Sequence, residues 1–447
     1  MMLRNPLLLL LAAAVVLGQD RPPKLKIQQH QFPNGLRMVM VEDHSRPVIN
    51  LQVWYHVGSK DERQGRTGFA HLFEHMMFRG SKNVGPEEHM RYVRQAGGQV
   101  NAYTSFDMTV YWETFPSHYL ERMLWLEADR MDSLNINEEI FKKEREVVKE
   151  ERRLRIENPP YGLVQDDLWA IAYKEYPYKH TPIGSMEDLN AATAADVQEF
   201  FDTFYVPNNA TVVIVGDFDA KQAIAWTAKN FGRIPRSRKP VPRVTATEPK
   251  QTEFREVTKR YNNIPLPAIL NLYQLPPAGH ADAYPLEIAS AILSDGQSSR
   301  LYKRLVYDEQ SAVAAAGSAT FLEGPSLFFG FAVANMGKDI KEVGSSLNYA
   351  LEQMTKASVE PDEITKAKNQ ITNRYIQGAQ SMQQRADQLG RFAVLRGDAN
   401  LYNTELDKYL RVTADDILKV CQRYLIPTNT TRLWVYPEAD RAKEKKQ

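Results

Sequence analysis

The sequence has very little cysteine and almost no excess of charge of either sign. Cys421 is the single cysteine among 447 residues, so no intramolecular disulfide can form and no cysteine cluster can bind a metal ion. The 56 basic and 55 acidic residues leave a net charge of +1, which gives no indication of a nucleic-acid or membrane-surface partner. The length allows two or three domains with a large core.

Long apolar runs are also missing, except at the amino terminus. A basic residue, Arg4, precedes an apolar run over residues 7–17, and residues 16–18 match a cleavage site before Gln19. This order predicts a secretory signal peptide over residues 1–18. A retained membrane anchor is the alternative, although the run is shorter than the roughly 20 residues of a span. Export without any disulfide favours a bacterial periplasm.

The rest of the chain contains two similar halves. Residues 233–252 are rich in Pro, Arg, Lys and Thr and lack hydrophobic periodicity, which is typical of a linker. The segments 193–197 and 413–417 resemble each other at an offset of 413 − 193 = 220, and each is followed by a proline turn and a strand pattern. A constant offset without gaps indicates a duplicated domain. We therefore expect domains over 19–232 and 253–447.

The most informative motif is His71-Leu72-Phe73-Glu74-His75. It lies in a stretch of mostly good helix formers, and positions i and i+4 of a helix share one face, so His71 and His75 can bind one zinc ion. Glu74 points to the same side, where a carboxylate can accept a proton from a zinc-activated water. The motif is the inverse of His-Glu-x-x-His. The alternative is a helix with two ordinary polar or buried histidines.

A second acidic segment lies in the long, highly charged helix that is predicted over residues 137–157. Much of this charge is expected to face solvent. Glu144 and Glu151, however, lie two turns apart on one face, beside Val147 and Val148. A pair of carboxylates next to an apolar stripe is a candidate for a functional site.

Together the two segments resemble the pitrilysin family of inverzincin zinc metallopeptidases, within it the branch of the mitochondrial processing peptidases and their bacterial relatives. The resemblance implies one Zn²⁺ per chain with Glu151 as its third ligand beside His71 and His75, and with Glu144 supporting the site. Glu150 is the competing candidate for the third ligand. The implied activity is an endopeptidase for extended or unfolded peptides, with Glu74 as the general base.

The resemblance also implies the fold class. It is α+β, with two homologous α/β-sandwich domains whose mixed, mainly antiparallel sheets are packed with helices and face each other across a cavity. The second half has no counterpart of the histidine motif, because its corresponding helix over 284–293 has Ala and Leu at those places. The first half is therefore expected to be catalytic and the second half non-catalytic.

Residues 97–104 resemble the edge strand with which this family binds extended substrates. Such pairing recognises the peptide backbone more than its side chains. We therefore expect Asn101, Ala102 and Tyr103 to bind substrate. The alternative for Asn101 is an ordinary strand-end or turn residue.

One departure from the family pattern lies in the second half. Residues 296–301 resemble the family's Gly-Ser-Arg-Leu stretch, after which self-sufficient members carry an arginine and then a tyrosine. Val306 and Val313 occupy those places here, and Arg304 and Tyr307 have the wrong spacing. In two-chain members the partner supplies the pair. The resemblance therefore implies a heterodimer in which this chain is the catalytic subunit and a homologous chain without the zinc motif supplies Arg and Tyr.

Two other classes of function fit parts of the sequence. The same fold serves in non-catalytic peptide-binding or assembly subunits, although the zinc motif here is intact. A serine hydrolase would use Ser298 or Ser299, but the stretch is not a Gly-x-Ser-x-Gly elbow and no base is placed beside it.

Overall fold

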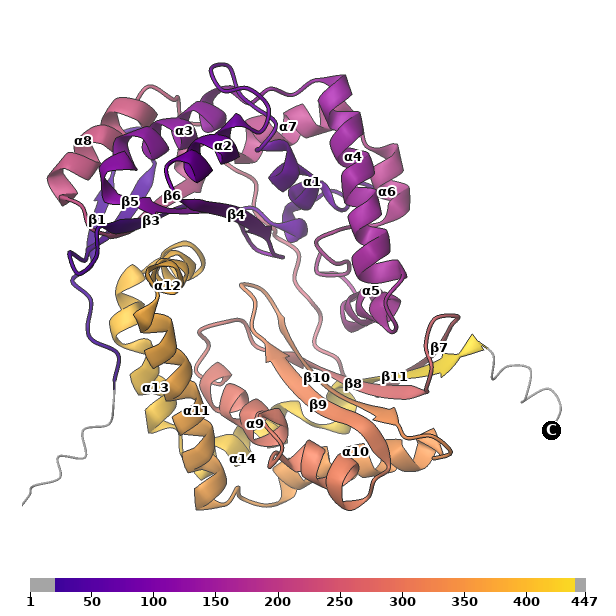
Figure 1. The fold of residues 1–447 in the computed structure, drawn as a ribbon. Helices are drawn as coiled ribbons and strands as arrows, with labels where there is room; N and C mark the ends of the chain where they lie inside the picture. Colours follow the sequence, from indigo (N-terminus) through magenta and orange to yellow (C-terminus); the bar gives the residue numbers. More distant parts are fainter. Residues whose placement is uncertain (1–20, 439–447) are drawn as a thin grey trace, which may run out of the picture.

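The computed structural model describes residues 21–438 as two α/β halves, each with one sheet covered by helices (Figure 1). The fold class predicted from the resemblance is confirmed. The predicted signal peptide lies outside the described residues. Within residues 21–438, no helix combines the length and the apolar character needed to cross a membrane.

The first half contains a six-stranded sheet with the order β1-β2-β6-β3-β5-β4. Its strands are β1 (Gln28–Gln31), β2 (Arg37–Glu42), β3 (Val48–Tyr55), β4 (Gln99–Thr104), β5 (Thr109–Pro116) and β6 (Ala210–Gly216). The central strands β3 and β6 are buried along almost their whole length, as expected for strands covered on both faces. Strand β4 lies at the edge and pairs with β5 alone, as the resemblance implied for residues 97–104.

The second half repeats this arrangement with the order β7-β11-β8-β10-β9. Its strands are β7 (Arg255–Tyr261), β8 (Ala268–Leu275), β9 (Ala312–Thr320), β10 (Ser326–Ala334) and β11 (Thr430–Pro437). In both sheets the first two equivalent strands are parallel (β2 with β6, β7 with β11), and the other equivalent pairs are antiparallel. Between the halves, residues 232–254 contain no helix or strand.

The helices follow the same internal repeat. Helices of the first half are α1 (Phe69–Met76), α2 (Glu88–Gln95), α3 (Leu120–Ser133), α4 (Glu138–Arg152), α5 (Gly162–Ala172), α6 (Met186–Ala191), α7 (Ala194–Phe204) and α8 (Ala220–Phe231). Those of the second half are α9 (Ala283–Ser294), α10 (Ile340–Lys356), α11 (Pro361–Gln380), α12 (Met382–Leu395), α13 (Glu405–Arg411) and α14 (Ala414–Tyr424). Helices α7 and α14 begin with the same capping box, Thr193 with Asp196 and Thr413 with Asp416. These matching caps lie at the 220-residue offset that the sequence predicted for the repeat.

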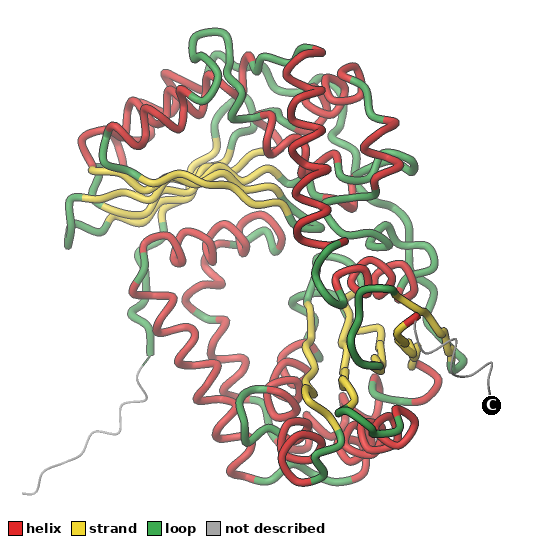
Figure 2. Tube along the Cα trace, turned by 45° about the vertical axis from the view of Figure 1, so that its right-hand side comes forward, coloured by secondary structure: helices red, strands yellow, loops and turns green. Residues whose placement is uncertain are grey.

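Two helices cross from one half to the other. Helix α12 of the second half packs on the face of the first sheet opposite α3 and α8, where Leu389 and Phe392 join Trp54 in one apolar cluster (Figures 1 and 2). Helix α5 of the first half packs on β8 and β11, with Leu168 and Leu433 in a shared cluster. Each sheet is therefore closed by a helix from the other half, an exchange that the sequence patterns did not predict.

A buried ion-pair cluster also joins the halves. The turn 321–325 between β9 and β10 brings Glu323 onto the first half, where its carboxylate contacts His56 Nε2 at 2.7 Å and pairs with Lys60. Lys60 Nζ also lies 2.9 Å from Asp107 Oδ1, and the Glu323 N–H donates to Asp107 Oδ2 at 3.0 Å. Both Lys60 and Asp107 are buried. This cluster stabilises one relative placement of the two halves.

Candidate metal centre

Helix α1 holds both histidines of the motif. It begins after Gly68, whose φ of +90° favours glycine and whose added Cβ would lie 2.6 Å from the Ile183 carbonyl oxygen. The buried carboxylate of Glu62 accepts hydrogen bonds from the N–H groups of Gly68 (3.0 Å) and Ala70 (2.7 Å). An acidic group here satisfies N–H groups that have no partner inside the helix. These contacts fix the residue at which helix α1 begins.

One face of α1 enters the core and the other carries the polar groups. Leu72, Phe73 and Met76 are buried, whereas His71, Glu74 and His75 are partly exposed. This division places the three polar side chains of the motif on the side that faces α4. The helical spacing predicted from the sequence is confirmed.

Helix α4 supplies the carboxylates. Its first turn is capped by Asn137, whose Oδ1 accepts from the Ile140 N–H at 2.9 Å. Phe141, Glu144 and Val148 are buried along one stripe, and Glu151 follows in the last turn. The predicted pairing of Glu144 and Glu151 on one face is thus present in the structure.

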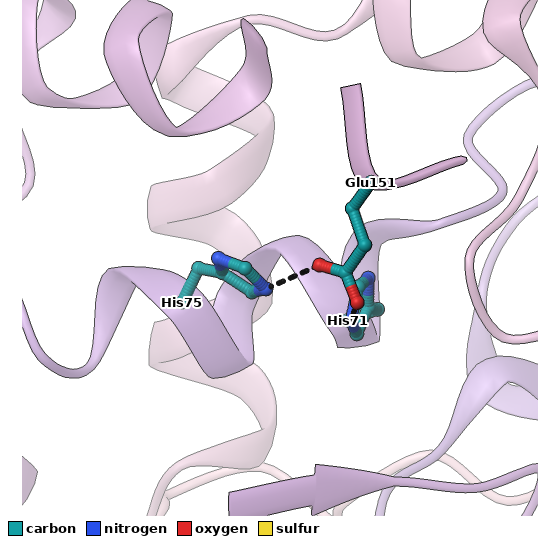
Figure 3. Close-up of side chains that lie close together, drawn as sticks. All are labelled: His71, His75 and Glu151. Atoms are coloured by element: carbon teal, nitrogen blue, oxygen red, sulfur yellow. Dashed lines mark ion pairs between the residues drawn. The ribbon is translucent and has the colours of Figure 1, made fainter. Parts of the chain in front are cut away.

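The structure brings His71, His75 and Glu151 together (Figure 3). His75 Nε2 lies 3.2 Å from Glu151 Oε2, and His71 Nε2 lies 3.7 Å from Glu151 Oε1. In a tetrahedral zinc site with bonds of about 2.1 Å, the ligand atoms lie about 3.4 Å from one another. Two imidazole nitrogens and one carboxylate also form the donor set of a catalytic zinc site that keeps one position open. The residues therefore fit a zinc ion.

Glu150, the competing ligand, does not reach this centre. Its carboxylate is exposed and pairs with Arg153 Nη1 at 2.8 Å. Glu144 lies on the other side of His75, with Oε2 3.8 Å from His75 Nδ1 and Oε1 2.8 Å from Arg79 Nε. A carboxylate beside the second ring nitrogen orients a ligating histidine.

The protonation of the two histidines differs. Burial, together with the neighbouring charge of His75, lowers the pKa of His71 to about 4. Burial opposes protonation of His75 as well, but the carboxylates of Glu144 and Glu151 raise the pKa of His75 to about 9. Since a metal ligand must be a neutral imidazole, metal binding is expected to release a proton from His75 near neutral pH.

Glu74 lies beside the triad and contacts the edge strand. Its Oε2 accepts a hydrogen bond of 2.6 Å from the Thr104 hydroxyl at the end of β4. Burial raises the pKa of Glu74, and the Thr104 hydrogen bond acts in the opposite direction. A carboxylate held in this way next to a metal can accept and return a proton.

A cavity of about 880 Å³ opens next to Glu74 and His75. Its wall is formed by α1, α2 and the edge strand, with Asn101 from β4 and Arg94 from α2 among the lining residues. The N–H of Ala102 donates to the Oδ1 of Asn101 at 2.9 Å, so a backbone donor of the edge is capped by a side chain. Asn101 thus lies at the site.

Tyr103 points elsewhere. Its ring packs edge-to-face on Trp54 with the centroids 6.3 Å apart, in the cluster that α12 covers. Of the three predicted substrate-binding residues, Tyr103 can therefore contribute its backbone, whereas its side chain belongs to the packing between the halves.

The second-half positions of the sequence argument lie in a different environment. Val306 is partly buried against the second core and Val313 is 48% exposed. Arg304 Nε donates to Ser346 Oγ at 2.8 Å, and Tyr307 is 72% exposed. Among the described residues, neither Arg304 nor Tyr307 contacts the triad.

The serine alternative finds no support in the local geometry. Ser298 Oγ accepts a hydrogen bond of 2.6 Å from Lys366 Nζ, and Ser299 is buried. Within residues 21–438, no histidine is hydrogen-bonded to either hydroxyl, so neither serine has the imidazole base of a Ser-His hydrolase.

A second group of metal-type side chains lies in the core of the first half. His89, Glu113 and Glu127 are fully buried, but Arg130 is among them and pairs with Glu127. A guanidinium already supplies the positive charge that two buried carboxylates need. We interpret this group as a structural network that ties α2, α3 and β5 together.

Sequence reasoning missed several groups that act on the site. Glu62 caps the metal helix, Thr104 holds Glu74, and Arg155 contacts Glu151 with an Nη1–Oε1 distance of 2.6 Å. Only Arg155 had a local signal, since it follows Glu151 by one helical turn. Glu62 lies six and eight residues before the N–H groups that it caps, across a loop without a regular period, and Thr104 lies 30 residues after Glu74.

A duplicated α/β fold with a His-x-x-Glu-His helix facing a glutamate from a second helix is the architecture of a metallopeptidase-type protein. The chain belongs to peptidase family M16. The family model described as "Insulinase (Peptidase family M16)" matches residues 37–185, and "Peptidase M16 inactive domain" matches residues 191–371. The triad and Glu74 lie within the first match.

Known proteins similar to this chain include several named as zinc proteases or peptidases. Zinc protease PqqE of Helicobacter pylori is 30% identical over 430 residues, which cover 95% of this chain and 96% of the relative. Mitochondrial-processing peptidase subunit beta of Lentinula edodes is 23% identical, covering 88% and 86%. Probable zinc protease PqqL of Escherichia coli is 30% identical, covering 61% of this chain and 31% of the relative.

Solved structures agree with the fold. The crystal structure of a protease from Helicobacter pylori superposes with a TM-score of 0.89 at 30% identity, covering 93% of this chain and 100% of the other. The first half of the periplasmic protease PqqL from Escherichia coli gives a TM-score of 0.76 at 20% identity, covering 95% of each chain. The second likeness concerns the fold alone.

Proposed function

We propose that this chain is a zinc-dependent endopeptidase that hydrolyses extended or unfolded peptides. One observation carries the proposal. The imidazoles of His71 and His75 and the carboxylate of Glu151 lie together beside Glu74, which is hydrogen-bonded to the end of the open edge strand β4. The names of its zinc-protease relatives support the same metal and the same reaction class.

In this proposal His71, His75 and Glu151 hold the metal. Zinc, when bound, supplies a Lewis acid for water and for the peptide carbonyl. Glu74 takes a proton from the attacking water and donates it to the leaving amine, while the Thr104 hydroxyl holds the Glu74 carboxylate.

Glu144 acts on the other side of the centre. Its carboxylate lies beside His75 Nδ1 and is paired with Arg79, so it can fix the orientation of the imidazole. In this role Glu144 is a positioning residue that does not touch the substrate.

The substrate is expected to add a strand to β4. Because β4 pairs with β5 alone, its other edge can hydrogen-bond to an extended peptide at Asn101, Ala102 and Tyr103 once the Asn101 side chain releases the Ala102 N–H. If the peptide runs antiparallel to β4, residues that follow the cleaved bond lie toward Gln99 and the cavity beside α2.

We further propose that the catalytic first domain, 19–232, is joined by the linker 233–252 to a non-catalytic second domain, 253–447. The chain would be the catalytic subunit of a heterodimer, with a homologous partner that lacks the zinc motif and supplies an arginine and a tyrosine. The valines at 306 and 313 support this proposal. Co-purification from the native host tests it, and recovery of the chain alone would contradict it.

A non-catalytic peptide-binding or assembly subunit of the same fold is the second candidate. The match of residues 191–371 to an inactive domain favours it, although the triad lies outside that segment.

The deciding experiment measures zinc per chain and peptide hydrolysis, with and without o-phenanthroline. An endopeptidase binds one zinc and loses hydrolysis with the chelator. Stoichiometric zinc without hydrolysis, in the presence of the native partner, would favour the second candidate.

We also propose export to a bacterial periplasm, with residues 1–18 as a signal peptide that is removed. The periplasmic protease PqqL, whose first half shares this fold, supports the compartment. Amino-terminal sequencing of the mature protein should begin at Gln19, and a sequence that begins at Met1 would contradict the cleavage.

A further inference from the structure

Helix α4 runs into a π-helical turn, Arg153–Glu157, that carries an arginine next to the metal centre. Arg155 Nη1 lies 2.6 Å from Glu151 Oε1, and the Arg155 side chain is 72% exposed. Of the residues that the structure describes, no other lysine or arginine is ion-paired with a member of the triad of His71, His75 and Glu151.

The neighbouring arginines of this segment have other partners. Arg152 is buried, donates to the Gly184 carbonyl oxygen and pairs with Asp166. Arg153 pairs with Glu150 on the exposed side of the helix. Arg155 is therefore the member of this basic run whose guanidinium reaches the centre.

The Arg155 guanidinium lies within the cluster of charged and polar groups that would hold the metal. Its Nη1 contacts Glu151, whose carboxylate oxygens lie 3.7 Å from His71 Nε2 and 3.2 Å from His75 Nε2. The guanidinium is therefore close enough to act on a negative charge that forms beside the triad.

The chemistry of a guanidinium suits this place. It carries five N–H donors in a planar fork, and one of its nitrogens contacts Glu151. A divalent cation at the triad would compete with Arg155 for the carboxylate and repel the guanidinium. The exposed side chain could then turn toward the substrate, whose carbonyl oxygen becomes negative as water attacks it. Donors that point at such an oxygen stabilise the transition state.

We propose that Arg155 is the substrate-binding cation that this chain contributes, and that it donates hydrogen bonds to the carbonyl oxygen of the peptide bond under attack. This inference rests on the proposed peptidase function. It assigns a catalytic residue to the first half, and it holds whether or not a partner chain adds contacts from the other side.

The test uses zinc-loaded full-length protein, together with the partner chain if one co-purifies, and a fluorescein-labelled phosphinic peptide library. A phosphinic group carries a tetrahedral, anionic oxygen like that of the attacked carbonyl, and anisotropy reports its affinity without turnover. Arg155→Ala should weaken binding about 10–100-fold, the effect of one hydrogen bond to a charged group, and Arg155→Lys should weaken it less. Arg153→Ala, two residues away and facing Glu150, is the matched control and should bind as the wild type does.

Zinc content separates binding from positioning. If Arg155→Ala loses zinc but binds the phosphinic peptides normally once saturated with zinc, Arg155 only positions Glu151 and the proposal is overturned. Equal losses in Arg153→Ala, or no binding by the zinc-loaded wild type, overturn it as well. Peptide hydrolysis is measured separately. If the wild type binds the phosphinic peptides through Arg155 but cleaves no peptide, the peptidase function alone is refuted. If Arg155→Ala binds the phosphinic peptides with unchanged affinity and the wild type cleaves peptides, this inference alone is refuted.

Discussion

Thr104 donates a hydrogen bond of 2.6 Å to Glu74, and this contact joins the last residue of the edge strand to the motif on helix α1. The hydrogen bond therefore fixes the position of the Glu74 carboxylate relative to the open edge of β4. A peptide added along β4 would arrive beside Glu74 without rearrangement of the backbone. Such preorganisation is what a site of this kind requires.

The contact predicts a loss of activity when the hydroxyl is removed. Thr104→Val keeps the shape of the side chain but leaves Glu74 without this donor, so kcat/KM for peptide hydrolysis should fall about 10–100-fold, as expected for a hydrogen bond to a charged group. Thr104→Ser retains the hydroxyl and should keep most of the activity. Equal activity of the two variants in a fluorogenic peptide assay would refute the role of the hydroxyl.

The choice between neighbouring glutamates can be tested by metal binding. Glu151→Gln removes a carboxylate from the triad, whereas Glu150→Gln removes an exposed partner of Arg153. Loss of a group that only orients a metal ligand weakens metal binding about 10–100-fold. Glu151 is a proposed ligand itself, so Glu151→Gln should weaken zinc binding by more than about 100-fold. Chelator competition measures this. Zinc binding that is lost in Glu150→Gln and kept in Glu151→Gln would reverse the assignment.

Local patterns predicted much of the first half. The spacing of His71 and His75 predicted one helical face, and the heptad from Glu144 to Glu151 predicted another, because both depend only on the 3.6-residue period. The similar segments 193–197 and 413–417 predicted the duplication through their constant offset, and in the structure both helices begin with the same capping box. These are signals within single elements.

The contacts between elements could not be predicted in this way. The helical period of α12 predicts an apolar face but does not indicate which surface that face packs against. The packing of Leu389 on Trp54 of the first sheet therefore could not be predicted. Lys60 and Glu323 are likewise distant in sequence and meet only in the folded chain. The bond from Thr104 to Glu74 depends on where β4 ends relative to α1, which no local pattern records.

The ion-pair cluster between the halves should make stability depend on acid pH. Burial alone would raise the pKa of Glu323, but the His56 hydrogen bond and the charges of His56 and Lys60 lower it from 4.5 to about 2. A carboxyl with a lowered pKa in the folded state contributes stability above its unfolded pKa. That stability is lost as the pH falls from about 4.5 through about 2.

Urea unfolding between pH 2 and 5 measures this effect. The free energy of unfolding of the wild type should fall across this range, and Glu323→Gln should show a shallower fall because its side chain does not titrate. Identical slopes for the two proteins would contradict the role of Glu323 in holding the halves together.

The crossing helix predicts a sharp steric limit at Gly390 in α12. A Cβ at this position would lie 2.1 Å from the buried ring of Trp54, so Gly390→Ala should lower the free energy of unfolding by about 1–3 kcal/mol despite the better helix propensity of alanine. Gly378→Ala in α11 is the control, because the one tight contact of its Cβ would be with the flexible end of the Gln388 side chain. Urea unfolding that finds Gly390→Ala as stable as Gly378→Ala would refute the packing argument.

The most direct test of the central claim is peptide hydrolysis by zinc-loaded Glu74→Gln at a zinc content matched to the wild type. Glutamine keeps the size of the side chain but cannot accept the proton from water, and general-base catalysis contributes about 10²–10⁴-fold. The proposed function predicts full zinc occupancy and a rate that falls by at least about 100-fold. Hydrolysis by Glu74→Gln at the wild-type rate, with equal zinc, would contradict it.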